Sequence, residues 1–338
     1  MQSKPFFSNV GRRRLGQAAL ATLAMCALGA PLAATAQSAW PDRAITMVLG
    51  YPPGGINDVI ARKLAIELST VLKVPVIVDN RAGANGSIAA NFVAKSRPDG
   101  YTVMFGAIGQ VSVNQFLLKK MPYEPGDLIP VGKVADGANV LVVNVEKAKT
   151  YSSVAKLIED AKRRPGQMNY GSFGTGSSSH LSAALFAKQA GINVTHVPYK
   201  GSAPAMMDLL GGNLDFMFDS INTALPHIKA GKIIPLAVTK GERSIALPQV
   251  PTFVESGLRD FTLASWFGVH LPKGTPPEIV TKLNAAIRTV QAQPEFIEHF
   301  KAQNIDITPS TPKEYGDFVA SEDRRWGALI KELGIQID

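Results

Sequence analysis

A glycine-rich segment near the start of the chain has the composition of an anion-binding loop. The segment Tyr51–Arg62 (YPPGGINDVIAR) follows the apolar run Ile45–Gly50, which is typical of a buried strand in a parallel sheet. Prolines and glycines end this strand, and apolar residues at helical spacing follow in Asp58–Leu72. This order places free backbone N–H groups at the positive end of a helix, where a carboxylate can bind. The alternative is that Gly54 and Gly55 only allow a tight turn.

A second loop of the same kind favours the anion-binding interpretation. The segment Met168–Gly191 has the pattern of a strand, a loop rich in Gly and Ser, and a helix that ends with Gly191 as its C-cap. The loop contains Thr175, Ser177 and Ser178, whose hydroxyl groups can donate hydrogen bonds to an anion. Two loops of this type predict a binding site for a small anion.

The chain lacks the motifs of a nucleotide-binding protein or an enzyme. Ser179 replaces the third glycine of G-x-G-x-x-G, and neither a P-loop nor a G-x-S-x-G elbow occurs. The serines next to His180 at a helix start cannot readily form a nucleophile–base pair. No zinc-ligand spacing joins the five histidines, which are His180, His196, His227, His270 and His299. The sequence therefore predicts neither catalysis nor a metal or other cofactor.

The first 36 residues have the features of a cleaved export signal peptide. The basic residues Arg12–Arg14 precede the Ala-rich stretch Leu15–Ala34, and Ala34–Ala36 forms a small-x-small cleavage site. The arginines also fit the twin-arginine export route. An uncleaved membrane anchor is the alternative. We expect a periplasmic protein that begins at Gln37.

Removal of this leader leaves a mildly basic chain without cysteine. The net charge of +8 falls to +4, because the leader contains four basic residues and no acidic residue, and Cys26 lies within it. No long basic run predicts a nucleic-acid partner. Without cysteine, neither a disulfide nor a thiolate metal site can form. About 300 residues remain, enough for one large or two medium domains.

Strands and helices alternate along the remaining chain, which predicts an α/β fold with doubly wound sheets flanked by helices. A second α/β unit begins near Thr150, and the long helices predicted near the C-terminus are expected to pack on the first sheet. The first lobe would then comprise residues 37–141 and 264–338, and the second lobe residues 142–263. The connections between the lobes would lie near Asn139–Asn144 and Leu263–Leu271.

Several sequence blocks, in the same order, resemble the Bug-type receptors of tripartite tricarboxylate transporters. They extend from Trp40 to the last helix and include VIVDNRAGANGSIAA, RPDGYTVMFG, GTGSSSHLSAALF, VTHVPYKGSAPAMMDLLGGNLDFMFD and WFGVHLPKGTPPEIVTKLN. The resemblance implies a two-lobed periplasmic binding protein of the Venus-flytrap type. Such a protein closes around a small organic acid, commonly a di- or tricarboxylate or an aromatic carboxylate.

The resemblance also implies which residues contact the ligand. The loops Tyr51–Asp58 and Gly174–His180 would face each other across the cleft and hold one carboxylate with backbone amides and ordered waters. The expected amide donors lie in Gly54–Asn57 and Gly176–Ser178, and Asp58 is expected to cap its helix. The full set of expected ligand-binding residues is Tyr51, Gly54, Gly55, Asn57, Thr175, Gly176, Ser177, Ser178, His180, Asp219 and Trp266.

Two of these residues have open roles. Asp219 ends a predicted strand and could accept a hydrogen bond from a ligand hydroxyl or amine, or only order Lys200. Trp266 fits equally a ligand-contacting wall and the protein core.

The resulting expectation is a monomeric solute-binding protein that delivers a carboxylate to the permease subunits of a tripartite transporter. A ligand-sensing partner of a membrane sensor kinase would have the same fold and remains an alternative. A periplasmic enzyme acting on a carboxylic acid is a second alternative, but it would need a nucleophile–base pair or a metal cluster.

Overall fold

One mixed sheet connects the residues that the computed structural model describes, which are residues 1–3 and 40–334. Eight strands follow in the order β2-β1-β3-β9-β4-β7-β5-β6, and β8 and β10 pair with β4 in addition. The strands are β1 (Ile45–Leu49), β2 (Val76–Asn80), β3 (Thr102–Ala107), β4 (Leu128–Asn144), β5 (Asn169–Ser172), β6 (Thr195–Pro198), β7 (Phe216–Ser220), β8 (Ile233–Val238), β9 (Ala264–Pro272) and β10 (Ile305–Ile307). The predicted leader at residues 1–36 lies almost entirely outside the described residues.

The sheet contains two parallel three-stranded units with the same internal order. Strand β1 pairs in parallel with both β2 and β3, and β5 pairs in parallel with both β6 and β7. In each unit the strand that comes first in the sequence lies in the middle. At the carboxyl edge of each unit, the loop after the central strand and the loop after its neighbour therefore run apart. Sheets in α/β proteins bind ligands at such a point.

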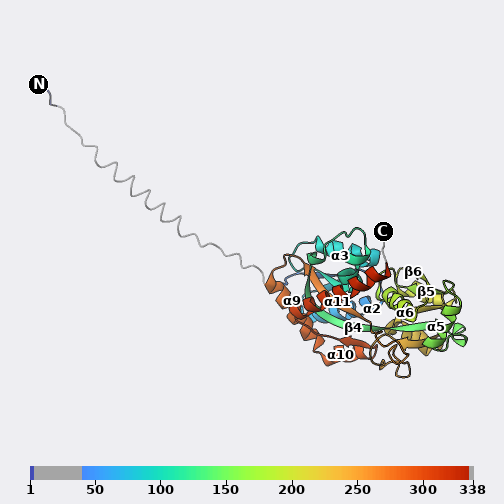
Figure 1. Cartoon of the computed structure of the whole chain (residues 1–338). Helices are drawn as coiled ribbons and strands as arrows, with labels where there is room; N and C mark the ends of the chain where they lie inside the picture. The colour runs from blue at the N-terminus through green and yellow to red at the C-terminus, as the bar shows by residue number, and fades with distance from the viewer. Residues whose placement is uncertain (4–39, 335–338) are drawn as a thin grey trace. The chain divides into compact units, whose positions relative to one another are not determined.

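The long strand β4 is shared by the two halves of the sheet. Its part Leu128–Ala138 runs antiparallel to β9, and its part Asn139–Asn144 runs antiparallel to β7 and β8. Residues 137–144 are all buried, which explains their nearly continuous apolar sequence. Figure 1 shows α9, α10 and α11 near one end of β4 and α5 near the other. The extended structure predicted for this segment is confirmed.

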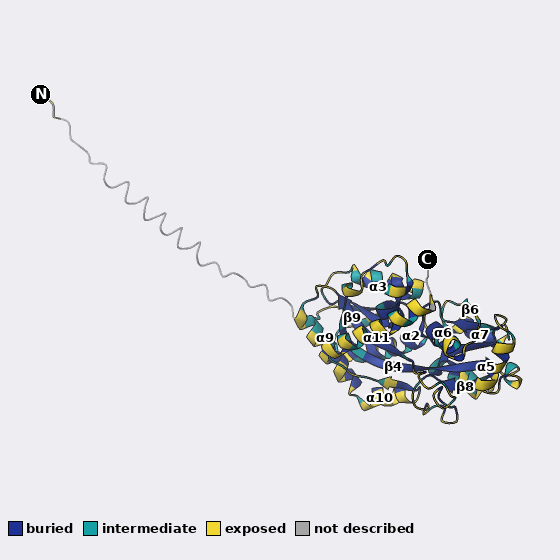
Figure 2. Cartoon of the chain, in the orientation of Figure 1, coloured by how far each residue is buried: buried dark blue, intermediate teal, exposed yellow. Residues whose placement is uncertain are grey.

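Helices cover the sheet and bury their apolar faces against it, while their exposed faces point outward (Figure 2). One core joins α2 and the C-terminal helices α9 and α10 to β1, β3 and β9. A second core, rich in phenylalanine, joins α5 and α6 to β5, β7 and the end of β4. The helices are α2 (Ile56–Leu72), α3 (Ser87–Ala94), α4 (Asn114–Leu117), α5 (Val154–Arg163), α6 (Ser178–Ala190), α7 (Ser202–Leu210), α8 (Ile221–Lys229), α9 (Pro277–Gln291), α10 (Pro294–Lys301) and α11 (Pro312–Leu333).

Helix ends follow the local sequence closely. Ser153 caps α5 by accepting the Lys156 N–H, and Thr311 forms a reciprocal capping box with Glu314 at the start of α11. Gly191 ends α6 in the left-handed conformation, as the sequence predicts. The sequence analysis did not predict α10, β10 or the π-helical turn Gly109–Val113.

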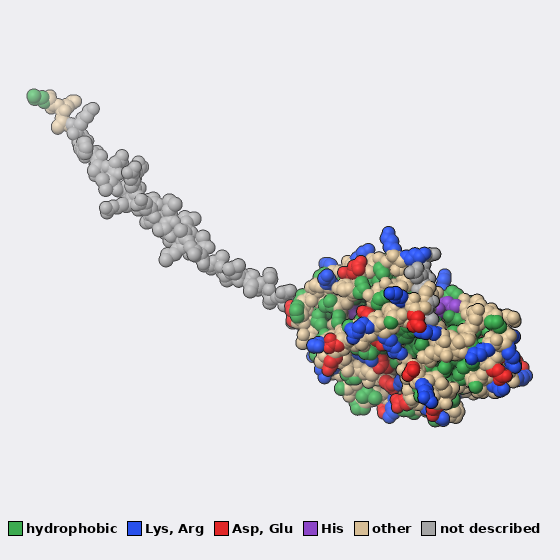
Figure 3. Space-filling model, viewed as in Figure 1, with side chains coloured by type: hydrophobic (Ala, Val, Ile, Leu, Met, Phe, Trp, Pro, Cys, Tyr) green, Lys and Arg blue, Asp and Glu red, His purple; other side chains and the backbone are tan. Residues whose placement is uncertain are grey.

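Acidic and basic side chains are interspersed on the face shown in Figure 3. Among the described helices, none combines the length and apolarity needed to cross a bilayer.

Candidate functional site

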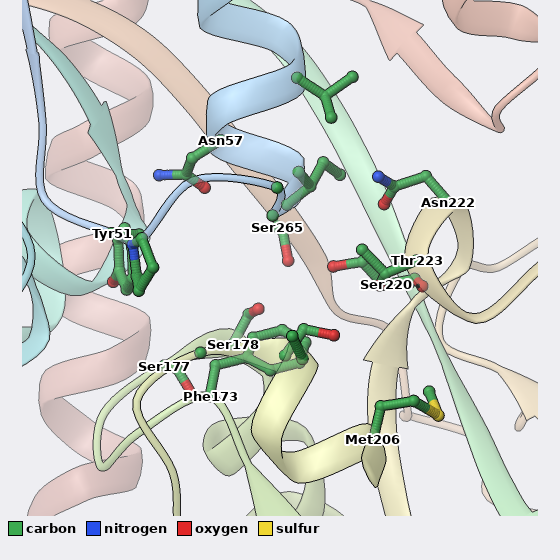
Figure 4. A pocket seen from close by; sticks show the side chains of 18 of the residues that line it. Tyr51, Asn57, Phe173, Ser177, Ser178, Met206, Ser220, Asn222, Thr223 and Ser265 are labelled. Carbon is green, nitrogen blue, oxygen red and sulfur yellow. Dashed lines mark hydrogen bonds between the residues drawn. The ribbon is translucent and has the colours of Figure 1, made fainter. Parts of the chain in front are cut away.

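A cavity of about 460 Å³ lies at the carboxyl ends of both parallel units. The loops after β1 and β3 line it with residues 51–57 and with Ala107 and Ile108. The loops after β5, β6 and β7 line it with Phe173, Ser177 and residues 200–204, among others. Figure 4 shows Tyr51 and Asn57 on one side of the cavity and Ser220, Asn222 and Thr223 on another. Its volume suits a small organic molecule.

Four helices begin at this cavity. The first residues of α2, α6, α7 and α8, or the residues that cap them, line its wall. The first N–H groups of a helix have no acceptor within that helix, and each N-terminus acts as about half a positive charge. Among the described residues, the lining contains no Asp or Glu, and its basic side chains are the exposed Lys200 and the half-buried His227. The cavity is therefore built to attract an anion with backbone dipoles.

The loop before α2 uses one of its amides internally. The Gly54 N–H donates to Asp58 Oδ2 at 3.1 Å, so this expected ligand donor is already occupied. Asp58 also accepts hydrogen bonds from Arg62 and Asn80. Burial alone would raise the pKa of Asp58, but these hydrogen bonds and the Arg62 charge lower it. Asp58 therefore holds the loop before α2 through Gly54, but the expectation that it caps the helix is wrong, because Gly55 is the N-cap and no side chain caps it by a hydrogen bond.

The amides that remain available at α2 are those of Gly55 and the first two helical residues, Ile56 and Asn57. Gly55 caps the helix in an extended conformation, with φ of −79°. The Asn57 side chain is buried, and its Nδ2 has no hydrogen-bond partner among the described residues. Asn57 lines the cavity, and a ligand oxygen that reached its Nδ2 would supply the missing partner.

The loop before α6 also satisfies two of its own amides. The Gly176 N–H donates to His180 Nδ1 at 3.0 Å, and the Ser177 N–H donates to the Gly174 carbonyl oxygen. The Ser177 hydroxyl donates to that same carbonyl oxygen and accepts the His180 N–H. These bonds correct the expectation that Gly176 and Ser177 offer free amides to a ligand. Within the described chain, the groups left without a partner are the amides of Ser178 and Ser179 and the Ser178 hydroxyl, and of these two residues Ser178 lines the cavity.

His180 holds this loop in place from behind the cavity wall. Its ring is buried and stacks on His196, with ring centroids 4.1 Å apart. His196 in turn stacks on Tyr170, and its Nε2 lies 2.6 Å from Ser172 Oγ. Burial, together with the His196 charge, lowers the pKa of His180 to about 3. The neutral ring can therefore accept the Gly176 N–H at Nδ1, which a protonated ring could not do.

Acid is expected to destabilise the fold through His180. The unfolded chain binds a proton near the ordinary pKa of 6.5, whereas the folded ring stays neutral down to about pH 3. The contribution of His180 to the free energy of unfolding is therefore fully present above pH 6.5. About 3 kcal/mol of it is lost by pH 4. Urea unfolding of the wild type and of His180→Gln between pH 7 and pH 4 should show this change in their difference. A difference that does not vary with pH would contradict the prediction.

The structure brings together six of the eleven predicted ligand-binding residues in the cavity lining and places five outside it. Tyr51 lines the cavity, and its hydroxyl donates to Asn85 Oδ1 at 2.8 Å. The pKa of this phenol is raised because it is removed from water. The lining also includes Gly54, Gly55, Asn57, Ser177 and Ser178, and it leaves out Thr175, Gly176, His180, Asp219 and Trp266.

Trp266 belongs to the protein core. It is 1% exposed, its Nε1 donates to Glu322 at 2.9 Å, and its ring contacts Tyr315 and Phe318 edge-on. Of its two expected roles, the structure gives it the core role. Asp219 is buried behind the wall, where its hydrogen-bond partners are Ser202, Ser220 and Thr223 and do not include Lys200.

The sequence analysis missed the contribution of α7 and α8 and of Ser265 in β9. Ser202, Ser220 and Thr223 line the cavity, and so do Asn222 and Ser265, each with a buried polar atom that lacks a partner within the described residues. A signal was present, because Gly201 lies between a strand and a helix and Ser220 ends a strand directly before a helix, much as the loops after β1 and β5 do.

Comparison with known proteins identifies relatives along nearly the whole described chain. Residues 60–335 match the tripartite tricarboxylate transporter family receptor. The structure of Rpa4515 with adipate from R. palustris has a TM-score of 0.84 and 37% identity, covering 88% of this chain and 100% of that one.

Two further solved structures are similar. The periplasmic binding protein BugD has a TM-score of 0.82 and 32% identity, covering 88% of this chain and all of its own. MatC from Rhodopseudomonas palustris with bound malate has a TM-score of 0.80 and 29% identity, covering 86% and 100%. The predicted two-lobed periplasmic binding protein fold is confirmed. This chain therefore belongs to the receptor family of the tripartite tricarboxylate transporters.

Proposed function

We propose that this protein is a periplasmic receptor that captures a small organic carboxylate in the cavity and passes it to a membrane permease. The observation that carries the proposal is the meeting of the N-termini of α2 and α6 at a cavity whose lining, among the described residues, contains no acidic side chain. Two similar proteins were solved with the carboxylates adipate and malate. Binding without chemical change is the activity that this arrangement supports.

The carboxylate would bind between the starts of α2 and α6. The amides of residues 55–57, the Asn57 side chain, the amides of Ser178 and Ser179 and the Ser178 hydroxyl supply the hydrogen bonds. Hydrogen bonds to a charged group contribute about 1.5–3 kcal/mol each, and both helix dipoles favour the negative charge. Apolar contacts from Ile56, Val59, Ile108, Phe173 and Met206 would enclose the body of the ligand.

Ligand capture would close two lobes with the boundaries predicted from the sequence, residues 37–141 with 264–338 and residues 142–263. Strand β4 changes its pairing partners between Ala138 and Asn139, and β9 begins at Ala264, which supports hinges at these positions. The loops on the two sides of the proposed cleft lie close together. A Cβ built on Gly201 would lie 3.4 Å from Pro52 Cγ, and one built on Gly176 would lie 2.6 Å from Asn85 Nδ2.

The remaining parts of the proposal concern export and partners. The leader would be cleaved after Ala36, so the mass of the exported protein should correspond to a chain that begins at Gln37. The receptor would act as a monomer and contact the permease subunits of a tripartite transporter.

A thermal-shift screen of small organic acids tests the proposed function. A ligand present at one hundred times its Kd should stabilise the fold by about 2.7 kcal/mol, because it binds only the folded state. Calorimetry should give one site per chain, and the ligand should be recovered unchanged after incubation. The proposal fails if no carboxylate stabilises the protein, or if product forms in proportion to the amount of protein.

A further inference from the structure

A buried carboxylate lies directly behind one end of the cavity. Asp219 is the penultimate residue of β7 and is fully buried, at 0% exposure. Its Oδ1 accepts hydrogen bonds from Ser202 Oγ, Thr223 Oγ1 and the Ser220 N–H, each at 2.8 Å. Its Oδ2 has no partner within the described residues. Ser202 belongs to α7 and Thr223 to α8, so Asp219 joins the starts of these two helices.

These contacts fix the direction of the hydroxyl protons at this end of the cavity. A hydroxyl group has one proton to donate and two lone pairs to accept. The Ser202 proton is used by Asp219, and the Thr223 proton is used by Asp219 or by the Ser220 carbonyl oxygen at 2.9 Å. Both side chains line the cavity and therefore present lone pairs, rather than protons, to a ligand.

A neighbouring side chain reinforces this accepting character. Asn222 lines the same end of the cavity, and its Oδ1 is buried without a hydrogen-bond partner in the described part of the chain. At the α2 end, in contrast, the unpartnered buried atom is the donor Asn57 Nδ2. A buried polar atom without a partner is costly. Asn222 Oδ1 therefore favours a ligand group that donates a hydrogen bond, and Asn57 Nδ2 favours one that accepts.

The local charge also differs between the two ends of the cavity, because it is less positive at the α7/α8 end than at the α2 end. Each helix N-terminus contributes about half a positive charge, so α7 and α8 together offset the single negative charge of Asp219. Burial raises the pKa of Asp219 to about 6, so this carboxylate is ionised at neutral pH and above. At the α2 end the negative charge of Asp58 is paired with Arg62, which leaves the dipoles of α2 and α6 uncompensated. Lys200 near α7 is exposed, so water screens its charge.

We propose that Asp219 sets the ligand class by making the α7/α8 end of the cavity accept hydrogen bonds, so that the preferred ligand carries a hydroxyl or ammonium group opposite its carboxylate. The inference rests on the proposed function and adds the second recognition element. A second ionised carboxylate would face oxygen lone pairs and a neutralised pair of dipoles. Asp219 acts as a positioning residue, because it orients Ser202 and Thr223 from behind the wall.

Calorimetry with length-matched ligands at pH 8 tests the inference. At each length from four to six carbons, the set contains the simple monocarboxylate, the ω-hydroxy acid, the ω-ammonio acid and the dicarboxylate dianion. At the best length, the hydroxy or ammonio acid should bind at least about tenfold more tightly than the dianion, a difference of about 1.4 kcal/mol. A dianion that binds more tightly than both donor-bearing acids would overturn the inference.

Variants separate this role from a purely structural one. Asp219→Asn should weaken the donor-bearing acids about tenfold or more and strengthen the dianion, since the α7/α8 end gains net positive charge. The simple monocarboxylate should change less than threefold. Asp208→Asn is the matched control, because it makes the same change on α7 at a residue that bonds Tyr199 and lies outside the cavity lining. It should leave the ligand order unchanged. Equal weakening of all four ligands by Asp219→Asn would overturn the inference.

A second pair of variants covers the case in which Asp219→Asn does not fold. Thr223→Val keeps the shape of the side chain but removes the accepting hydroxyl, whereas Thr223→Ser keeps the hydroxyl. The donor-bearing acids should lose affinity with valine and retain it with serine. Equal affinities in the two variants would overturn the inference. If no carboxylate binds the wild type at all, the proposed function fails, whereas binding without the expected order refutes only this inference.

Discussion

Replacing Gly176 by alanine is expected to weaken ligand binding at least about hundredfold, which corresponds to about 2.7 kcal/mol. Gly176 has φ of +81°, a conformation that costs an L-residue about 1–2 kcal/mol. A Cβ built there lies 2.4 Å from Leu117 Cδ1 and 2.6 Å from Asn85 Nδ2. Neither atom can move freely, because Leu117 is buried in a core cluster and Asn85 bonds Tyr51 and Asn114.

The clash would force the loop before α6 away from the loop that contains Asn85. That movement would also break the bond from the Gly176 N–H to His180 Nδ1 and shift the amides of Ser178 and Ser179 away from the carboxylate. Calorimetry with the best ligand measures the loss. Gly191→Ala is the matched control, since Gly191 ends the same helix at φ of +61° with no atom within 4 Å of a built Cβ. The control should lose stability but keep its affinity. Equal affinities in both variants would show that the loop geometry does not control binding.

Conversion of the ligand carboxylate to a primary amide is expected to reduce affinity about a thousandfold, or about 4 kcal/mol. The amide has nearly the same shape but no charge, so the N-termini of α2 and α6 both lose their favourable interaction. Its hydrogen bonds are those of a neutral acceptor, and its NH₂ group would face backbone donors. This loss exceeds that of any one hydroxyl group, because every donor of the site is affected together.

Ser178→Ala supplies the comparison for this prediction. Loss of one hydroxyl donor to a charged group should cost about 1.5–3 kcal/mol. Calorimetry with the acid and its amide, on the wild type and on Ser178→Ala, gives both values in one experiment. If the amide binds as tightly as the acid, or if replacing the exposed Lys200 abolishes binding while the amide does not, the backbone dipoles do not hold the carboxylate.

Predicted effects at the other glycines follow from their observed geometry. Gly55 does not need to be glycine for its backbone angles, because its φ of −79° is open to any residue. Gly55 lines the cavity, so we expect alanine there to weaken binding only by narrowing the approach of the ligand. Gly54 has φ of +85° with open space around its built Cβ, so alanine there would be strained without a clash.

The local sequence determined the elements that carry the site. Apolar runs followed by glycine-rich turns placed α2 directly after β1 and α6 directly after β5, and Gly191 marked the end of α6. These signals depend on backbone conformation and on hydrogen bonds between residues close in the chain. They are therefore readable without tertiary contacts, and the resemblance of the sequence blocks to a receptor family added the overall fold.

Only the tertiary structure decided which groups face the cavity. Gly54 and Gly176 looked like donors from the sequence, but Asp58 and His180 fold back to accept their N–H groups, and the cavity receives the next amides instead. Trp266 became core because α11, which starts more than forty residues later, supplies Glu322 to its indole N–H.

The α7/α8 end of the cavity shows the same limit. The starts of these helices meet the starts of α2 and α6 only because β6 and β7 flank β5 in one parallel unit, an order that depends on long-range pairing. Asp219 likewise gains Ser202 as a partner through packing across seventeen residues of chain. Local sequence fixes where a helix begins, whereas strand order and packing fix which helix starts share one ligand, because those depend on burial of surfaces from distant segments.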